Sequence, residues 1–127
     1  MEPVLRRGDY VLAVRSDAVT RGDIVVVEHP HRTGFELVKR VVGLPGERLV
    51  IGNGQVHIDG SPLAEPWAEG PTWPDGEWAL GDTAVFLLGD QRSRSTADGR
   101  ELGPLPVAAA RWRVASRYWP PRRIGLV

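Results

Sequence analysis

The chain has 127 residues, of which 42% are hydrophobic and 25% charged, and this composition is typical of one folded globular domain. Its sixteen acidic side chains balance sixteen basic ones, so no net positive charge favours nucleic acid as a partner. Cysteine is absent, which excludes disulfide bonds and a thiol nucleophile, and no apolar run reaches the ~18 residues that a membrane-spanning helix needs. We therefore expect a soluble chain that forms a single domain over residues 1–127 and binds no nucleic acid.

Glycine and proline are frequent enough to indicate the fold class. The chain has fifteen glycines and eleven prolines, and both residue types interrupt helices and are typical of turns. A mostly β fold with short strands is predicted. The first two strands are expected at residues 10–14 and 24–28, because each of these apolar runs follows an Arg-Gly-Asp turn sequence.

The next predicted strand, residues 35–42, contains the only lysine of the chain. Strand alternation places Leu37, Lys39 and Val41 on one face. The other fifteen basic side chains are arginine, which cannot accept a proton at accessible pH, whereas burial lowers the pKa of a lysine. Lys39 is therefore the one candidate amine base, and a solvated or edge-protecting lysine is the alternative interpretation.

The sequence pattern of residues 48–118 predicts a hairpin, an irregular excursion and two more strands. Residues 48–58 alternate around a Gly-Asn-Gly turn, as in a β-hairpin. Residues 61–81 are rich in Pro, Gly, Glu and Trp without periodicity, so a loop or short-stranded excursion is expected. We interpret residues 48–82 as a hairpin and loop insertion, followed by strands at 83–88 and 108–118.

Three segments of the chain combine glycine turns with ionisable side chains. Residues 1–9 are Met-Glu-Pro-Val-Leu-Arg-Arg-Gly-Asp, residues 38–47 are Val-Lys-Arg-Val-Val-Gly-Leu-Pro-Gly-Glu, and residues 88–100 are Leu-Gly-Asp-Gln-Arg-Ser-Arg-Ser-Thr-Ala-Asp-Gly-Arg. In this order they resemble the signature motifs of the signal peptidase I family. Those motifs are Ser-Met-x-Pro-Thr-Leu followed by Gly-Asp, Lys-Arg-x-x-Gly-x-Pro-Gly-Asp, and Gly-Asp-Asn-Arg-x-x-Ser-x-Asp-Ser-Arg. The third segment carries one extra residue between Ser95 and Asp98 and has Gly99 where the family has serine.

The resemblance implies antiparallel sheets that form a signal-peptidase-like β core, and a serine endopeptidase that uses a Ser-Lys dyad. It makes Lys39 the general base and Ser95 the residue whose hydroxyl holds the lysine amine, with Ser93 as an alternative for that second role. It also implies charged residues that brace the site, namely Arg40, Asp90, Asp98 and Arg100. A desolvated lysine suits this chemistry, because a serine nucleophile needs a base whose pKa lies near the working pH.

Substrate, location and cofactors follow from the same resemblance. The family admits small residues of a signal peptide into shallow apolar pockets, and the substrate is expected to add a strand to the sheet. The corresponding walls are Met1, Pro3, Leu5, Leu37 and Val38, for which an ordinary core role is the alternative. Signal peptides of exported preproteins are the implied partners, with action at the extracytoplasmic face of the membrane and no cofactor. Arginine and aromatic residues at 117–123 suit a membrane surface or, alternatively, a solvated tail.

The family's nucleophilic serine directly precedes the methionine that corresponds to Met1. No serine of this sequence stands in a Ser-Met-x-Pro setting, so we expect the chain as written to be inactive. The alternatives are a start assigned too late, a deliberate cut, and a true non-catalytic relative. We favour truncation, because the family's N-terminal membrane anchor would be lost together with the serine.

Two other kinds of function stay open. A specialised maturation protease or self-cleaving peptidase would share the dyad, and a non-catalytic β-domain would bind extended peptides without cutting them. A metal site is not expected, because the His-Pro-His sequence separates His29 from His31 and no carboxylate spacing supports His57 as a further ligand.

Overall fold

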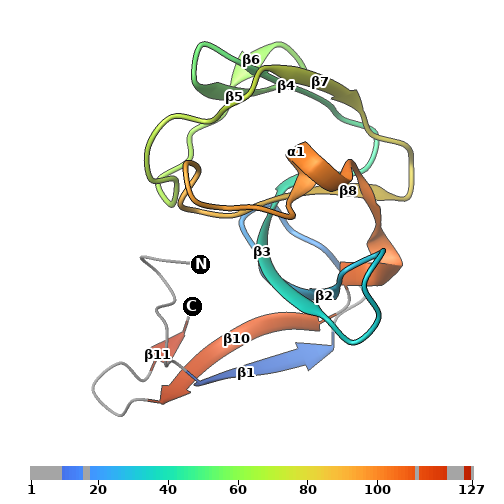
Figure 1. Cartoon of the computed structure of the whole chain (residues 1–127), viewed down its shortest axis with the longest axis vertical. Coiled ribbons are helices and arrows are strands. Elements are labelled where there is room, and N and C mark those ends of the chain that lie inside the picture. The colour runs from blue at the N-terminus through green and yellow to red at the C-terminus, as the bar shows by residue number, and fades with distance from the viewer. Residues whose placement is uncertain (1–9, 16–17, 111, 120–124, 127) are drawn as a thin grey trace.

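The computed structural model describes residues 10–15, 18–110, 112–119 and 125–126, and two antiparallel sheets dominate it (Figure 1). In the larger sheet the strand order is β1-β10-β2-β3-β8-β9, and β11 pairs with β10. Its strands are β1 Tyr10–Arg15, β2 Ile24–Glu28, β3 Glu36–Gly43, β8 Ala84–Leu88, β9 Leu105–Pro106, β10 Trp112–Trp119 and β11 Gly125–Leu126. The mostly β, antiparallel fold class is confirmed.

The smaller sheet comes from the predicted insertion and lies at the top of the view in Figure 1. Its strand order is β6-β5-β4-β7, with β4 Arg48–Gly52, β5 Gln55–Ile58, β6 Ser61–Pro62 and β7 Gly76–Ala79. The β4–β5 hairpin turns at Asn53 and Gly54, which both have positive φ, 54° and 76°. This is the conformation that two-residue hairpin turns favour, so the predicted hairpin is confirmed.

Strand β3 lies between β2 and β8 and sends side chains into two cores. Leu37 and Val41 pack in one buried cluster, whereas Val42 on the opposite face packs in another. The second cluster also contains Leu49 of β4 and Phe86 of β8, so the two sheets share it. The predicted alternation along β3 is confirmed, while the division into a single domain with an insertion stays a prediction.

One local expectation is wrong, and one element was not predicted. The last long strand begins at Trp112 instead of residue 108, because Val107–Ala110 form a short 3-10 helix, η1, directly after Pro106. A short helix that the sequence did not indicate, α1 at Gly99–Leu102, follows Asp98. The Asp98 carboxylate accepts a hydrogen bond from the Arg100 amide and thereby caps the first turn of α1.

Neither of these helices approaches the length or apolarity that crossing a membrane requires, and the same holds throughout the described part of the chain.

Candidate active site

Lys39 lies in the middle of β3, on the face that it shares with Leu37 and Val41. Its exposed fraction is only 9%. The amine Nζ donates one hydrogen bond to Ser95 Oγ at 3.0 Å and another to the backbone oxygen of Thr96 at 2.7 Å. The structure thus brings together the two residues that the sequence singled out for the centre of the site.

The loop that carries Ser95 begins where β8 ends, at Gly89. A Cβ atom at Gly89 would lie 1.9 Å from Ser95 Oγ and 3.6 Å from Lys39 Nζ. Any side chain there would therefore push the Ser95 hydroxyl away from the amine. Glycine at this position is required by the close approach of the loop to the end of the strand.

Asp98 lies on the other side of Ser95 and is 2% exposed. Burial by itself would raise the pKa of its carboxyl group. The Arg100 guanidinium lowers this pKa through its hydrogen bond and its charge, and the Gly89 and Arg100 amides lower it further. These effects outweigh burial, so the pKa of Asp98 is below its ordinary value. The Arg100 guanidinium contacts both carboxylate oxygens, at 3.1 Å and 2.7 Å. Asp98 is therefore ionised at neutral pH.

The donor and the acceptor of each hydrogen bond around Ser95 can be assigned. Ser95 Oγ lies 3.0 Å from Asp98 Oδ2, and an ionised carboxylate can only accept, so the hydroxyl donates to Asp98. The hydroxyl oxygen is then left to accept from Lys39 Nζ. An uncharged amine has two N–H groups, and Ser95 Oγ and the Thr96 carbonyl use both of them. The lone pair of an uncharged Nζ would remain free to accept a proton.

The charge state of Lys39 depends on a balance of effects. Burial lowers the pKa of its ammonium group and is the largest of them. The Asp98 carboxylate opposes burial, the Arg100 guanidinium adds to it, and the Glu101 carboxylate opposes it. The net direction is downward, toward the range in which an amine can act as a base near neutral pH.

Two departures from the family motif have local explanations. The extra residue between Ser95 and Asp98 is accommodated because Ala97 adopts a left-handed backbone conformation, with φ of 51°. Asp98 consequently still reaches Ser95 Oγ. Gly99 replaces a serine where a Cβ atom would lie 2.6 Å from the Phe86 ring, so a side chain at this position would not fit.

Arg40 and Asp90 form a buried ion pair behind the site. Two guanidinium nitrogens of Arg40 bind the two Asp90 carboxylate oxygens at 2.9 Å and 2.7 Å. A third donates to the Gly22 carbonyl at 2.7 Å, and the Trp67 ring centroid lies 5.0 Å from the guanidinium carbon. Asp90 directly follows Gly89, so the pair fastens the start of the Ser95 loop to β3.

Sequence reasoning missed another buried ion pair, between Arg92 and Glu65. The Arg92 side chain is 0% exposed and that of Glu65 is 8% exposed. Arg92 belongs to the third motif but has no role assigned by the resemblance, and Glu65 lies in the excursion outside all three motifs. No pattern in the sequence distinguishes Glu65 from the solvated carboxylates around it.

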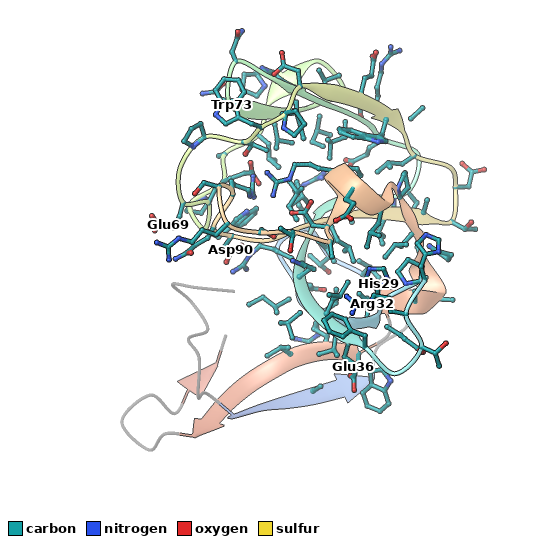
Figure 2. All side chains as sticks on the ribbon, in the orientation of Figure 1. His29, Arg32, Glu36, Glu69, Trp73 and Asp90 are labelled. Carbon is teal, nitrogen blue, oxygen red and sulfur yellow. The ribbon has the colours of Figure 1, made fainter. Side chains whose placement is uncertain are left out.

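A pocket of about 560 Å³ adjoins Ser95 on the surface. It is lined by residues of the Ser95 loop, of α1 and of the excursion, namely Trp73, Pro74, Arg92, Ser93, Ser95, Thr96, Ala97, Asp98, Arg100 and Glu101. Trp73, labelled in Figure 2, is 53% exposed, and its carbonyl accepts from the Arg100 guanidinium at 2.7 Å. The excursion therefore forms one wall of the site.

The remaining candidate residues are less central. Leu37 is buried in the core and Val38 is half-buried against Ile24 and Val114. Ser93, the alternative to Ser95, is exposed. The candidate pocket residues Met1, Pro3 and Leu5 lie outside the described residues.

Histidine does not assemble a metal site within the described ranges. His29 and His31 have ring centroids 6.0 Å apart beside the β2–β3 connection, where Figure 2 labels His29. No group of three or more His, Cys, Asp or Glu side chains that could hold a metal ion occurs in the part of the chain that the structure describes.

Comparison with known proteins decides the family. The family described as "Signal peptidase, peptidase S26" matches residues 1–119. The chain belongs to this signal peptidase family. Signal peptidase I of Leptolyngbya laminosa is 34% identical over 83% of this chain and 55% of its own length. The probable signal peptidase I-2 of Synechocystis sp. is 30% identical over 100% of the chain and 62% of its own length.

Two further proteins are similar to the chain. Subunit 1 of the mitochondrial inner membrane protease of Xenopus tropicalis is 29% identical over 98% of the chain and 67% of its own length. The crystal structure of a signal peptidase I from Enterococcus faecalis superposes with a TM-score of 0.67 at 24% identity, over 77% of this chain and 97% of that one. This likeness supports the fold. The chain spans 55% and 62% of the length of the two cyanobacterial relatives.

Proposed function

We propose that this chain is the catalytic region of a signal peptidase that cuts signal peptides from exported proteins with a Ser-Lys dyad. The single observation that carries the proposal is the environment of Lys39. Its amine is buried and bonded to Ser95 Oγ and the Thr96 carbonyl, and burial lowers its pKa. The family membership of the chain and the three ordered motifs support the same activity.

Lys39 is the general base of the proposed reaction. As the nucleophilic serine attacks the scissile carbonyl carbon, its hydroxyl proton passes to Nζ of Lys39. The ammonium then gives that proton to the leaving amine nitrogen as the C–N bond breaks, which leaves an acyl-serine. A water molecule then attacks the ester carbonyl carbon as it gives a proton to the same amine, and the ammonium returns that proton to the serine oxygen as the acyl C–O bond breaks, which regenerates the serine hydroxyl. Both protons are taken up at the lone pair that Ser95 and the Thr96 carbonyl leave free.

Ser95 and the charged residues hold this base in place. Ser95 accepts from Nζ and donates to Asp98, so it fixes the direction in which the lone pair points. Arg100 holds Asp98, and the Arg40–Asp90 pair holds the loop against β3. These residues orient the lysine and do not themselves exchange protons with the substrate.

The substrate is an extended peptide segment with small residues before the cleavage site. Leu37, Val38, Met1, Pro3 and Leu5 are the proposed walls of the apolar pockets, and backbone hydrogen bonds add the segment to the sheet. The membrane surface is the proposed place of action, on its extracytoplasmic face. Exported preproteins are the proposed partners, and the chemistry needs no cofactor.

A second candidate is a maturation protease that cuts a small set of dedicated precursors. The observation that favours it is the 29% identity to subunit 1 of the mitochondrial inner membrane protease of Xenopus tropicalis. Both candidates use the same dyad, so they differ only in substrate. A panel of signal-peptide sequences that is cut broadly supports the first candidate, and cleavage of few sequences supports the second.

A cleavage assay tests the proposed chemistry. The assay uses a form that carries serine directly before Met1, with a peptide that has Ala-x-Ala before the scissile bond. The matched controls carry alanine before Met1, or Lys39→Met in the serine form. Turnover that requires both the serine and Lys39 is expected. Binding of the peptide without turnover in the serine form would favour a non-catalytic peptide-binding domain instead.

A further inference from the structure

Glu65 is the point at which the excursion is fastened to the site. Its two carboxylate oxygens accept from the two terminal nitrogens of Arg92, at 3.1 Å and 2.6 Å. One of them also accepts from the indole nitrogen of Trp67 at 3.1 Å. Two-point contact between a carboxylate and a guanidinium is the most directional ion pair that side chains make. Glu65 therefore fixes the positions of two other side chains at once.

Arg92 transmits this contact to the backbone beside Ser95. Its Nε donates to the Gly89 carbonyl at 2.8 Å, and one terminal nitrogen donates to Thr72 Oγ1 at 2.8 Å. Gly89 is the residue whose Cα lies against the Ser95 hydroxyl, and its amide donates to Asp98 Oδ2 at 3.2 Å. A shift of Arg92 would consequently move the backbone on which Ser95 rests.

Trp67 transmits the second contact to Arg40. The Trp67 ring lies over the Arg40 guanidinium, which in turn holds Asp90. Backbone bonds join the same two segments, because the Glu69 amide donates to the Asp90 carbonyl at 2.8 Å. Figure 2 shows Glu69 and Asp90 next to each other at one side of the molecule. The excursion thus contacts the start of the Ser95 loop from two directions.

On the basis of the proposed function, we propose that Glu65 is a positioning residue that sets the Ser95 loop against Lys39. It acts through Arg92 on Gly89 and through Trp67 on the Arg40–Asp90 pair, and it touches neither the substrate nor the amine. The segment between β6 and β7 then has a catalytic purpose, since its Glu65 supplies the contact that holds the base in its buried setting.

The test compares Glu65→Gln with Glu69→Gln. Both substitutions remove one carboxylate from the same segment, but the Glu69 side chain is exposed, whereas that of Glu65 is 8% exposed. The readout is the pKa of Lys39, measured by NMR from its 13Cε shift during a pH titration. Lys39 is the only lysine, so labelled lysine gives one side-chain signal and needs no assignment.

The Lys39 pKa is expected to rise toward the ordinary lysine value in Glu65→Gln and to stay at the parental value in Glu69→Gln. Water that reaches the amine when the loop loosens causes this rise. In the serine form, Glu65→Gln is expected to lower kcat by roughly tenfold to a hundredfold with a smaller change in KM. An unchanged Lys39 pKa in folded Glu65→Gln would overturn the proposal.

A double variant separates positioning from the neutralisation of a buried charge. Glu65→Gln with Arg92→Met removes both charges of the pair, so that no unpaired charge stays buried. We expect the Lys39 pKa to stay raised in this variant, because it lacks the Arg92 bond to the Gly89 carbonyl. Recovery of the parental Lys39 pKa in the double variant would show that Glu65 acts only as the counter-ion of Arg92, and it would contradict the proposal.

Thr72→Val covers the case in which Glu65→Gln does not fold. It removes one acceptor of Arg92 without changing charge or shape, and a smaller rise of the Lys39 pKa is expected. A parental value in Thr72→Val would contradict the proposal in that case. The outcome is distinct from a failure of the proposed function, which would appear as an ordinary lysine pKa in the parental protein itself.

Discussion

Ser95 Oγ accepts a hydrogen bond from Lys39 Nζ at 3.0 Å, although the two residues are 56 positions apart in the chain. Strand β8 makes this contact possible. It pairs with β3 in the sheet and ends at Leu88, so that the following loop turns back over the Lys39 side chain. The loop that carries Ser95 therefore starts from the strand next to the one that carries Lys39.

Replacing Ser95 tests its role as the partner of the base. In the form with serine before Met1, Ser95→Ala is expected to lower kcat/KM on the order of a hundredfold, because the amine loses the acceptor that orients it. Ser93→Ala is the matched control, and little change is expected since Ser93 is exposed. Equal losses of kcat/KM in the two variants would contradict a specific role for the Ser95 hydroxyl.

A methyl group at Gly89 is expected to disrupt the site with limited damage to the fold. Its Cβ would lie 1.9 Å from Ser95 Oγ, so Ser95 must move. We expect Gly89→Ala to destabilise the protein by about 1–3 kcal/mol, as overpacking does, and to abolish most activity of the serine form. Gly81→Ala is the control, since a Cβ there would meet no atom within 4 Å. Chemical denaturation and the cleavage assay measure the two effects.

The buried amine has a cost in stability that depends on pH. Burial lowers the pKa of Lys39 in the folded state below the ordinary value of 10.5, so the unfolded chain binds more protons between the two values. The stability of the parental protein should rise with pH across that interval. Lys39→Met is expected to be more stable by about 1 kcal/mol below the interval, and its advantage should vanish above it. Urea denaturation at several pH values measures this difference, and a difference that does not vary with pH would contradict the burial of a titrating amine.

Asp98 is expected to make the stability of the fold depend on pH in the acidic range. Its lowered pKa means that it contributes stability above the ordinary aspartate pKa and that this contribution is lost as pH falls through the folded value. Asp98→Asn should cost about 3 kcal/mol at neutral pH, because Arg100 is left without its buried partner. At a pH below the folded value the variant and the parental protein should be equally stable. An acid-induced unfolding curve that is identical for both proteins at every pH would exclude this role.

The sequence predicted those parts of the site that local patterns determine. Alternation along β3 placed Lys39 on the same face as Leu37 and Val41, and the structure shows that both neighbours are buried. The motif resemblance indicated Ser95 and Asp98, which the structure brings within hydrogen-bond distance of each other. The irregular excursion was also predicted, including its lack of long strands.

The rest depends on contacts that no local pattern encodes. Glu65 lies in a segment without periodicity, and only the folded chain places it against Arg92, 27 positions away. Helix α1 has four residues and begins at a glycine, so its sequence is typical of a loop. Only the structure shows that Asp98 caps a helical turn there. The fit of the extra residue depends on the left-handed conformation of Ala97, which alanine rarely adopts. Tertiary packing determines all three features.

The pKa of Lys39 in the folded protein is the most direct test of the whole account. The protein is labelled with 13C-lysine, and the single side-chain signal is followed through a pH titration, with the denatured chain as reference. The account predicts that the folded protein titrates below 10.5 and the denatured chain near it. A folded-state value at or above that of the denatured chain would contradict the claim that Lys39 is a buried base.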